Sequence, residues 1–346
     1  MVKQSTKVRS PLPEFVEPQL ATLVDSVPPG DEWIHELKFD GYRILCRVEN
    51  GRASFLTREA QDWTHRFTVL GGIAKDLTAR TLLLDGEVVA LGPDGINDFQ
   101  LLQNWLKHTA SARLVYYVFD LLHLDGRDFR AEPLTARKGK LRELLGAGAR
   151  RSAPYRYSEH WLGDQGDALH KKACASGLEG IISKRKNQPY RSGRSKDWLK
   201  IKCLKSQEFV IGGFTDPAGS RAYLGALLIG VYDNKKLTYG GKVGTGFNNK
   251  SLSDLRARLD SIESHESPFV NPPRGADARG VHWVRPELVC EINFTGWTTD
   301  GLLRHPSFKG LREDKPAEKV IRESAETAPA DSKARPVPRP GRSRRV

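Results

Sequence analysis

The stretch "ELKFDGYR", residues Glu36 to Arg43, places a lysine between two acids and a glycine at the end of an apolar strand. Side chains alternate across a strand, so Glu36 and Lys38 face the same side, and Asp40 and Gly41 then end the strand in a turn. A lysine beside acids is usually part of a surface ion pair of small energetic value. At a strand end next to a glycine turn, Lys38 also suits a nucleophile, provided that cations or a metal-bound phosphate lower its pKa from about 10.4.

Two further lysines offer such cations. In Trp198-Leu199-Lys200-Ile201-Lys202, both lysines share one face of the predicted strand with Trp198, and the two aliphatic residues share the other. By itself, this pattern is typical of a solvated edge strand, where lysine is common. A functional interpretation therefore depends on the other motifs of the chain.

Carboxylates also occur at predicted strand ends. Asp85 and Glu87 flank a glycine and share a face, and Glu179 leads into the apolar strand from Gly180 to Lys184. Each is compatible with an ordinary turn acid, but two such carboxylates that converge would suit magnesium, which uses one or two carboxylates together with substrate phosphates. Phe119, in the predicted strand Leu114–Leu122, is by itself most simply a core residue.

The pattern of predicted elements indicates an α+β chain with two folded domains. Residues 1–204 suit antiparallel sheets with flanking helices, since strands and helices do not alternate strictly. In residues 205–322, about five short strands and one helix suit a β-barrel of the OB type. Residues 323–346 are rich in Ala, Pro, Ser and Arg and predict a disordered basic tail. Within the predicted domains, the strands and helices span Trp33–Leu37, Tyr42–Val48, Leu82–Val89, Phe99–His108, Leu114–Leu122, Leu134–Leu145, Gly180–Lys184, Trp198–Ile201, Phe209–Phe214, Ala226–Tyr232, Leu237–Val243, Ser251–Leu259 and Leu288–Phe294.

The composition limits the classes of function. The net charge of +13 favours a polyanionic partner, although six of those charges lie between Lys333 and Val346. The four cysteines are scattered singly, which predicts neither a CxxC zinc site nor a dense disulfide framework and favours a reducing, cytoplasmic setting. No apolar run is long enough to span a bilayer, and the first residues lack the apolar region of a secretory signal, so no membrane association is expected.

The order of the motifs carries a resemblance that no single motif supports. Lys38-x-Asp-Gly-x-Arg, Thr57-Arg58, Asp85-Gly-Glu, Phe119-Asp-Leu, Glu179-Gly-Ile-Ile-x-Lys and Lys200-x-Lys follow one another as in the covalent nucleotidyltransferases, which include DNA ligases, RNA ligases and capping enzymes. Arg312-Glu-Asp-Lys315 resembles the last ligase motif. Phe15–Thr22 and Gly241–Phe247 resemble the ligase module of bacterial end-joining DNA ligases, and from the chain length we expect this module to stand alone, without polymerase or nuclease modules. Since the cysteine-rich zinc element and the helix-hairpin-helix region of NAD-dependent ligases are missing, the resemblance implies ATP as the nucleotide.

The resemblance also implies roles for individual residues. Lys38 would attack the α-phosphate of ATP and carry AMP, and Lys200 and Lys202 would neutralise that phosphate. Glu87 and Glu179 would hold the ribose and a Mg²⁺ or Mn²⁺ ion. The adenine ring would stack on Phe119 near Glu36. The remaining groups would hold the ribose and phosphates or orient pyrophosphate: Arg43, Arg58, Arg312, Asp314 and Lys315.

These roles imply a DNA ligase that acts as a monomer in DNA repair. Its partners would be duplex DNA with nicks or breaks and a Ku-like end-binding protein, and the second domain would swing about a hinge near Lys202–Gln207 to admit DNA. Two alternatives stay open at this point. One is an RNA ligase or capping enzyme, which the Arg-x-Asp-Lys ending and the OB domain disfavour. The other is a DNA-binding scaffold that has lost catalysis, which the intact motif lysines and acids disfavour.

Overall fold

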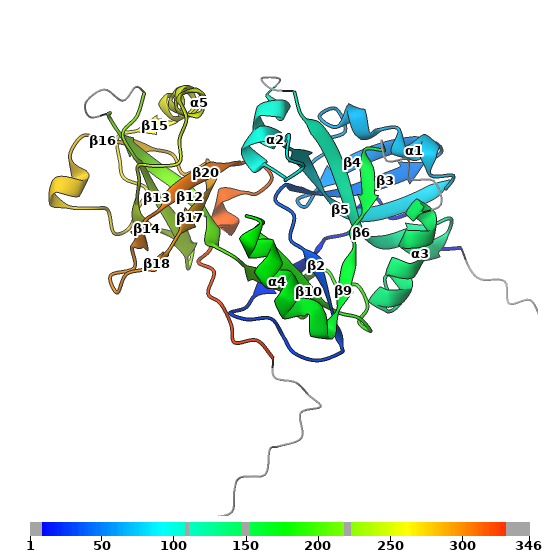
Figure 1. Ribbon diagram of the computed structural model, residues 1–346. Coiled ribbons are helices and arrows are strands. Elements are labelled where there is room, and N and C mark those ends of the chain that lie inside the picture. The colour runs from blue at the N-terminus through cyan, green and yellow to red at the C-terminus, as the bar shows by residue number, and fades with distance from the viewer. Residues whose placement is uncertain (1–8, 108–110, 147–152, 218–222, 330–346) are drawn as a thin grey trace, which may run out of the picture.

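The computed structural model describes residues 9–107, 111–146, 153–217 and 223–329. Figure 1 shows two lobes side by side, the first built on two β-sheets and the second on one curled sheet. Apart from two parallel pairs, β1 with β11 and β6 with β8, the strand pairings are antiparallel in the described part of the chain. The expected α+β class is confirmed, and a doubly wound parallel sheet is excluded.

A five-stranded sheet carries the strand that leads to Lys38. Its strand order is β1 (Gln19–Leu23), β11 (Gly193–Lys202), β10 (Gly180–Arg185), β2 (Trp33–Leu37) and β9 (His160–Leu162). Helix α4 (Gly166–Ala175) packs on β10 and β2 and buries one face of the sheet with Leu169 and Ala173. Leu199 and Ile201 lie in this apolar cluster, so Lys200 and Lys202 point to the opposite face.

A six-stranded sheet forms the rest of the first domain. Its order is β4 (Arg52–Thr57), β3 (Tyr42–Glu49), β5 (Thr81–Leu91), β6 (Arg113–Leu124) and β7 (Arg127–Asp128), with β8 (Tyr155–Tyr157) beside β6. Three helices flank it: α1 (Ile73–Asp76), α2 (Phe99–Leu106) and α3 (Leu134–Gly146). A small cluster that includes Leu45, Phe119 and Trp198 joins residues of both sheets, so the two sheets pack as layers of one domain.

The turn between β2 and β3 requires a glycine. A Cβ atom on Gly41 would lie 2.1 Å from the carbonyl oxygen of Val88, far inside van der Waals contact. The chain therefore passes from one sheet to the other directly after Lys38, and any side chain at position 41 would push this turn away from β5.

The second domain is a curled sheet around its own core. Strand β12 (Lys205–Thr215) pairs with β13, β16 and β17, and the core holds apolar residues from all of these strands and from α5. The elements are β13 (Leu227–Asp233), β14 (Lys236–Val243), α5 (Asn249–Asp260), β15 (Glu263–Ser264), β16 (Val281–Val284), β17 (Val289–Phe294), β18 (Gly296–Trp297), β19 (Leu303–Arg304) and β20 (Ser307–Arg312). This arrangement agrees with the expected OB type.

The segment that follows the second domain returns to the first (Figure 1). Glu326 forms a parallel bridge with Val24, and its carbonyl oxygen accepts a hydrogen bond of 3.1 Å from the amide of Asp25. We call residues 321–329 the C-terminal strap. The sequence placed a disordered tail from residue 323 onward, whereas residues 323–329 lie along β1 because backbone pairing and polar contacts hold them there; residues 330–346 are outside the described residues.

Two other features were not expected from the sequence. Cys174 and Cys203 form a disulfide, although the sequence indicated a reducing setting and gave no sign of this pair. Helix α4 and strands β1, β4, β9, β16 and β20 are also absent from the expected elements. No helix in the described part of the chain is long and apolar enough to cross a membrane.

Candidate active site

One cavity of about 1000 Å³ collects the predicted site residues from seven separated motifs, six in the first domain and one in the second. It is lined by residues of β2, β10 and β11 of the five-stranded sheet, of β3, β5 and β6 of the six-stranded sheet, and of the second domain. All twelve predicted residues line it: Glu36, Lys38, Arg43, Arg58, Glu87, Phe119, Glu179, Lys200, Lys202, Arg312, Asp314 and Lys315.

Lys38 stands directly after β2 on the wall of this cavity. Its amide donates a hydrogen bond of 2.9 Å to the carbonyl of Gly180, which extends the β2–β10 pairing and fixes the backbone. Its Nζ atom lies 2.5 Å from Oε2 of Glu179. Burial by itself would lower the pKa of Lys38, but the carboxylates of Glu179 and Glu87 outweigh it and the pKa lies above its ordinary value. Without a nucleotide, Lys38 is therefore protonated and not yet nucleophilic.

The two predicted metal-binding acids differ in their surroundings. Burial opposes ionisation of Glu179, but Lys38, Lys309 and Lys202 outweigh that burial and lower its pKa. The side-chain carboxylate of Glu87 forms no hydrogen bond or ion pair within the described residues, and burial raises its pKa to about 7. A half-buried carboxylate without a partner, close to a second carboxylate and open to a cavity, fits a hard divalent cation.

Asp85 does not join this pair of acids, although it is only two residues from Glu87. Its carboxylate is fully buried and accepts two hydrogen bonds from Arg43, of 2.7 and 2.6 Å, and one of 2.6 Å from the hydroxyl of Tyr190. A register shift between Asp85 and Gly86 interrupts the pairing of β5 with β6 at this point. Asp85 therefore orients the guanidinium of Arg43, which itself lines the cavity.

Glu36 and Phe119 form the inner wall with a lysine that the sequence analysis quoted but gave no role. The buried carboxylate of Glu36 lies 2.8 Å from Nζ of Lys138 and 3.1 Å from Nζ of Lys184. The same Lys184 ammonium lies 4.4 Å from the centroid of the Phe119 ring, and burial lowers the pKa of Lys184 to about 8. Glu36 thus forms ion pairs with both lysines and holds Lys184 beside the ring of Phe119.

Lys200 and Lys202 do not lie on a solvated edge, because β11 is paired on both sides by β1 and β10. Nζ of Lys202 donates hydrogen bonds of 2.9 Å to the carbonyl and hydroxyl oxygens of Ser206, and it is 3.6 Å from Glu179. Nζ of Lys200 contacts both carboxylate oxygens of Glu323, at 2.7 and 2.8 Å. Burial lowers the pKa of Lys200 to about 8.

The second domain closes the cavity through polar contacts. Arg58 of the first domain lies 2.8 Å from Glu208 and 3.2 Å from Asp314. Arg312 pairs with Asp314 and donates a hydrogen bond of 3.1 Å to the carbonyl of Gly41, in the turn after Lys38. Lys315 pairs with Glu208. The motif Arg312–Lys315 of the second domain is therefore held against the motif Lys38–Arg43 of the first domain.

Sequence reasoning missed several charged residues that complete this site. Asp40 lies 2.8 Å from Lys309, which also lies 3.5 Å from Glu291, and all three stand near Glu179. Burial, with Glu179 and Glu291 nearby, raises the pKa of Asp40 to about 6. Glu291 and Glu323 lie outside the quoted motifs, and Lys309 lies just before the one that begins at Arg312. The packing of the second domain and of the strap on the first domain brings them to the cavity. Asp40 and Lys184 were quoted inside motifs and could have been found there.

Comparison with known families defines the class of this protein. Residues 18–202 match the model described as "ATP dependent DNA ligase domain", and residues 220–315 match "ATP dependent DNA ligase C terminal region". The two matches cover most of the chain, so the protein belongs to the ATP-dependent DNA ligase family. The resemblance inferred from the ordered motifs is confirmed.

Individual relatives narrow the similarity to one branch of that family. The chain is 43% identical over 318 residues to the multifunctional non-homologous end joining protein LigD of Pseudomonas aeruginosa, covering 91% of this chain and 37% of that protein. It is 36% identical over 313 residues to the LigD of Mycolicibacterium smegmatis, covering 89% and 40%. The chain thus spans less than half of these relatives. A solved structure of mycobacterial DNA ligase D complexed with ATP and MES is similar with a TM-score of 0.64 at 33% identity, covering 88% of this chain and 98% of that one.

Proposed function

We propose that this protein is an ATP-dependent DNA ligase that seals breaks in duplex DNA through a lysyl-AMP intermediate and a DNA-adenylate. The observation that carries the proposal is the placement of Lys38: its amine faces the cavity, held by a single carboxylate, with Lys200 and Lys202 on β11, on the far side of β10 in the same sheet. The similar ligase structure bound to ATP and the family membership support ATP as the nucleotide.

In the first step, Nζ of Lys38 forms a bond to the α-phosphorus of ATP. The bond from that phosphorus to the bridging oxygen breaks, and pyrophosphate leaves with the electron pair. Lys200 and Lys202 stand where they can neutralise the α-phosphate as its charge redistributes. Arg312, Asp314 and Lys315 would orient pyrophosphate, and the ring of Phe119 would stack on adenine.

Before this attack, Lys38 must lose its proton. The carboxylates of Glu179 and Glu87 oppose this loss because they raise the pKa of Lys38. Both carboxylates fit Mg²⁺ or Mn²⁺, and such an ion would neutralise them and polarise the phosphate oxygens. With such an ion bound, the two carboxylates would no longer raise the pKa of Lys38.

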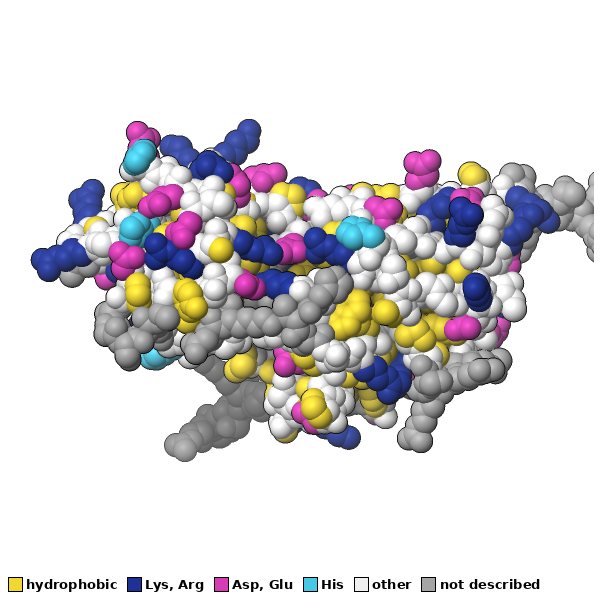
Figure 2. Space-filling view, turned by 90° about the horizontal axis from the view of Figure 1, so that it is seen from above, with side chains coloured by type: hydrophobic (Ala, Val, Ile, Leu, Met, Phe, Trp, Pro, Cys, Tyr) yellow, Lys and Arg dark blue, Asp and Glu magenta, His cyan; other side chains and the backbone are white. Residues whose placement is uncertain are grey.

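The later steps need DNA in place of the second domain. Arg43 and Arg58 line the cavity and would bind the 5′-phosphate at the break. This phosphate displaces Lys38 from AMP, and the 3′-hydroxyl of the adjoining strand then displaces AMP. Seen from above, Figure 2 shows Lys and Arg side chains in several groups between acids; basic groups of this kind can contact a phosphate backbone without sequence readout.

The proposal extends to the cellular role. Similarity to LigD supports work in non-homologous end joining, with a Ku-like end-binding protein as the recruiting partner. We further propose that the protein acts as a monomer in the bacterial cytoplasm, on the nucleoid.

The test is covalent labelling with α-labelled ATP and magnesium, followed by a denaturing gel. The wild-type protein retains label and transfers it to nicked duplex DNA, and the Lys38→Ala variant retains none. Label from GTP but not from ATP would assign the protein to the capping enzymes, and sealing of RNA but not DNA would assign it to the RNA ligases. Absence of label from a folded wild-type protein would refute catalysis altogether.

A further inference from the structure

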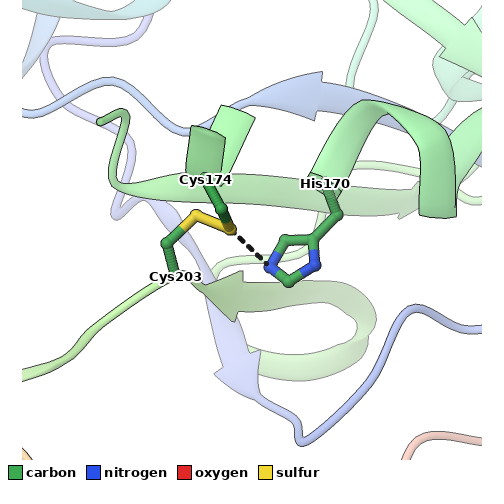
Figure 3. The surroundings of a disulfide bond; sticks show 3 residues. All are labelled: His170, Cys174 and Cys203. Carbon is green, nitrogen blue, oxygen red and sulfur yellow. Dashed lines mark hydrogen bonds between the residues drawn. A yellow bond between two sulfur atoms is a disulfide. The ribbon is translucent and has the colours of Figure 1, made fainter. Parts of the chain in front are cut away.

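The disulfide joins helix α4 of the first domain to the connection between β11 and β12, which leads into the second domain. Cys174 stands in the last turn of α4, and Cys203 follows β11 where the chain leaves the first domain for β12; their Cα atoms are 5.2 Å apart. Figure 3 shows His170, one helical turn before Cys174, with its ring directed at the bond. Nε2 of His170 lies 3.5 Å from Sγ of Cys174.

The bond also lies next to the reacting centre. Cys203 directly follows Lys202, and its amide donates a hydrogen bond of 3.0 Å to the carbonyl of Glu179, the residue whose side chain holds Lys38. Lys202 in turn contacts Ser206 across the interdomain connection. The disulfide therefore fastens Cys203, which follows Lys202 in the expected hinge, to a helix of the first domain.

The other two cysteines provide a contrast. Cys46 and Cys290 are fully buried in separate apolar cores, and burial raises the pKa of both thiols. Cys174 and Cys203 are only partly buried, and Cys174 has an imidazole at hand to exchange a proton. Partial exposure beside a base is the setting of an exchangeable cysteine pair, whereas a buried thiol in apolar surroundings is inert.

We propose that Cys174 and Cys203 form a reversible thiol–disulfide modification site that restrains the interdomain hinge when oxidised. The partner is a small-molecule thiol or disulfide of the glutathione or dithiol class. In oxidation, a Cys174 thiolate attacks a low-molecular-weight disulfide and expels one thiol. Cys203 then displaces the second thiol from the mixed disulfide, so two protein thiols are oxidised, one small disulfide is reduced to two thiols, and His170 accepts the proton of Cys174.

This regulation rests on the proposed function. Self-adenylation uses the closed arrangement described above and leaves the hinge in place, so it proceeds equally in both redox forms. DNA sealing requires the second domain to swing away, which changes the backbone around Cys203. The oxidised protein therefore seals nicks slowly, and reduction restores the rate.

The experiment compares full-length protein equilibrated with oxidised glutathione and with dithiothreitol. Non-reducing peptide mapping identifies the Cys174–Cys203 bond in the first sample. Preadenylated protein of each form is then mixed with nicked duplex without free ATP. We expect sealing to be at least about fivefold slower in the oxidised form, as expected for a rate-limiting hinge, with equal rates of self-adenylation. Cys174→Ser and Cys203→Ser each abolish the difference, and Cys46→Ala, the control, retains it.

A second readout requires no catalysis. Hydrogen exchange of the backbone amides between Cys203 and Gln207 should be slower in the oxidised form and should rise to the reduced level in Cys174→Ser. Failure of both forms to label with ATP would refute the proposed function and leave this readout intact. Failure of the bond to form, or equal sealing and equal exchange in both forms, would refute the redox site.

Discussion

Replacing Glu323 by Gln probes the C-terminal strap where it enters the nucleotide cavity. Glu323 places both carboxylate oxygens within 2.8 Å of Nζ of Lys200, and the two side chains are only 23% and 13% exposed. In the absence of ATP, the Glu323 carboxylate therefore occupies Lys200, the lysine that is proposed to neutralise the α-phosphate. The strap and the nucleotide cannot both hold Lys200, so ATP has to displace Glu323.

The size of the effect follows from the contact that is lost. The contact of the Glu323 carboxylate with the Lys200 ammonium joins two charged groups and contributes about 1.5–3 kcal/mol, whereas the amide of Gln keeps one hydrogen bond to that ammonium, of about 1 kcal/mol. The net loss of about 0.5 to 2 kcal/mol weakens the competing state by roughly twofold to thirtyfold, and the apparent affinity for ATP rises by the same factor. We expect KM for ATP in self-adenylation to fall by this factor in Glu323→Gln, with little change in the maximal rate.

Glu326→Gln is the matched control. Glu326 also lies on the strap, but its side chain pairs at 2.9 Å with Lys196 in solvent, where an ion pair contributes about 0–1 kcal/mol. Initial labelling rates over a range of ATP concentrations compare the two variants with the wild type. A KM in Glu323→Gln that equals or exceeds the wild-type value, or an equal fall in Glu326→Gln, would refute competition for Lys200.

Other perturbations test the remaining assignments. Lys38→Ala should fold, as judged by circular dichroism, and lose all label from α-labelled ATP; retained label would place the nucleophile elsewhere. Glu179→Ala and Glu87→Ala should each depress adenylation severely over a magnesium titration, and wild-type behaviour in both would make them ordinary turn acids. Because burial raises the pKa of Glu87 to about 7, its carboxylate is ionised above that pH and protonated below it. The magnesium concentration for half-maximal labelling should therefore rise about tenfold from pH 8 to pH 6, as the ionised fraction falls from about 0.9 to about 0.1, and a flat profile would contradict this assignment. Truncation after Pro329 should leave labelling intact and reduce the slope of log affinity for nicked DNA against log salt by at most about 0.9 per lost contact. Truncation after Arg322 should in addition lower KM for ATP, and loss of labelling there would show that the strap supports the fold.

Much of the first domain could be predicted because its strands are apolar, alternating and bounded by glycine or charged turns. The expected strand Trp33–Leu37 coincides with β2, and the helix Leu134–Leu145 falls within α3. The short strands that pair with the predicted ones were missed because a strand of three residues, such as β9, is too short to show alternating hydrophobicity. Helix α4 was missed because its sequence, GDALHKKACA, has a weak apolar stripe and a glycine at its first position.

The site was predictable to the extent that its residues fall in contiguous motifs. Lys38, Glu179 and Lys200 were predicted from the order of their short motifs, although no motif sufficed alone, and the structure brings all of them to one cavity. The contacts between domains carry no local signal. Nothing near Glu323 indicates that it reaches Lys200, 123 positions earlier in the chain, since that distance is bridged only by the packing of the strap. The roles assigned to the site residues stay predictions until the variants are measured.

The way in which the second domain closes on the first has a consequence for how often the molecule can open. The contacts described across the cavity mouth are between charged or polar groups: Arg58 with Asp314, Lys309 with Asp40, and Arg312 with the carbonyl of Gly41. Each of the two large apolar cores of the described chain lies within one domain, so separation of the domains exposes little apolar surface. This interface is held by electrostatic and polar contacts and not by apolar packing. Water and counterions can replace each contact, so ionic strength shifts the equilibrium between the closed and open forms. Under the proposed function, the protein closes around a nucleotide and opens for duplex DNA in every turnover, and an interface that salt loosens would allow faster opening.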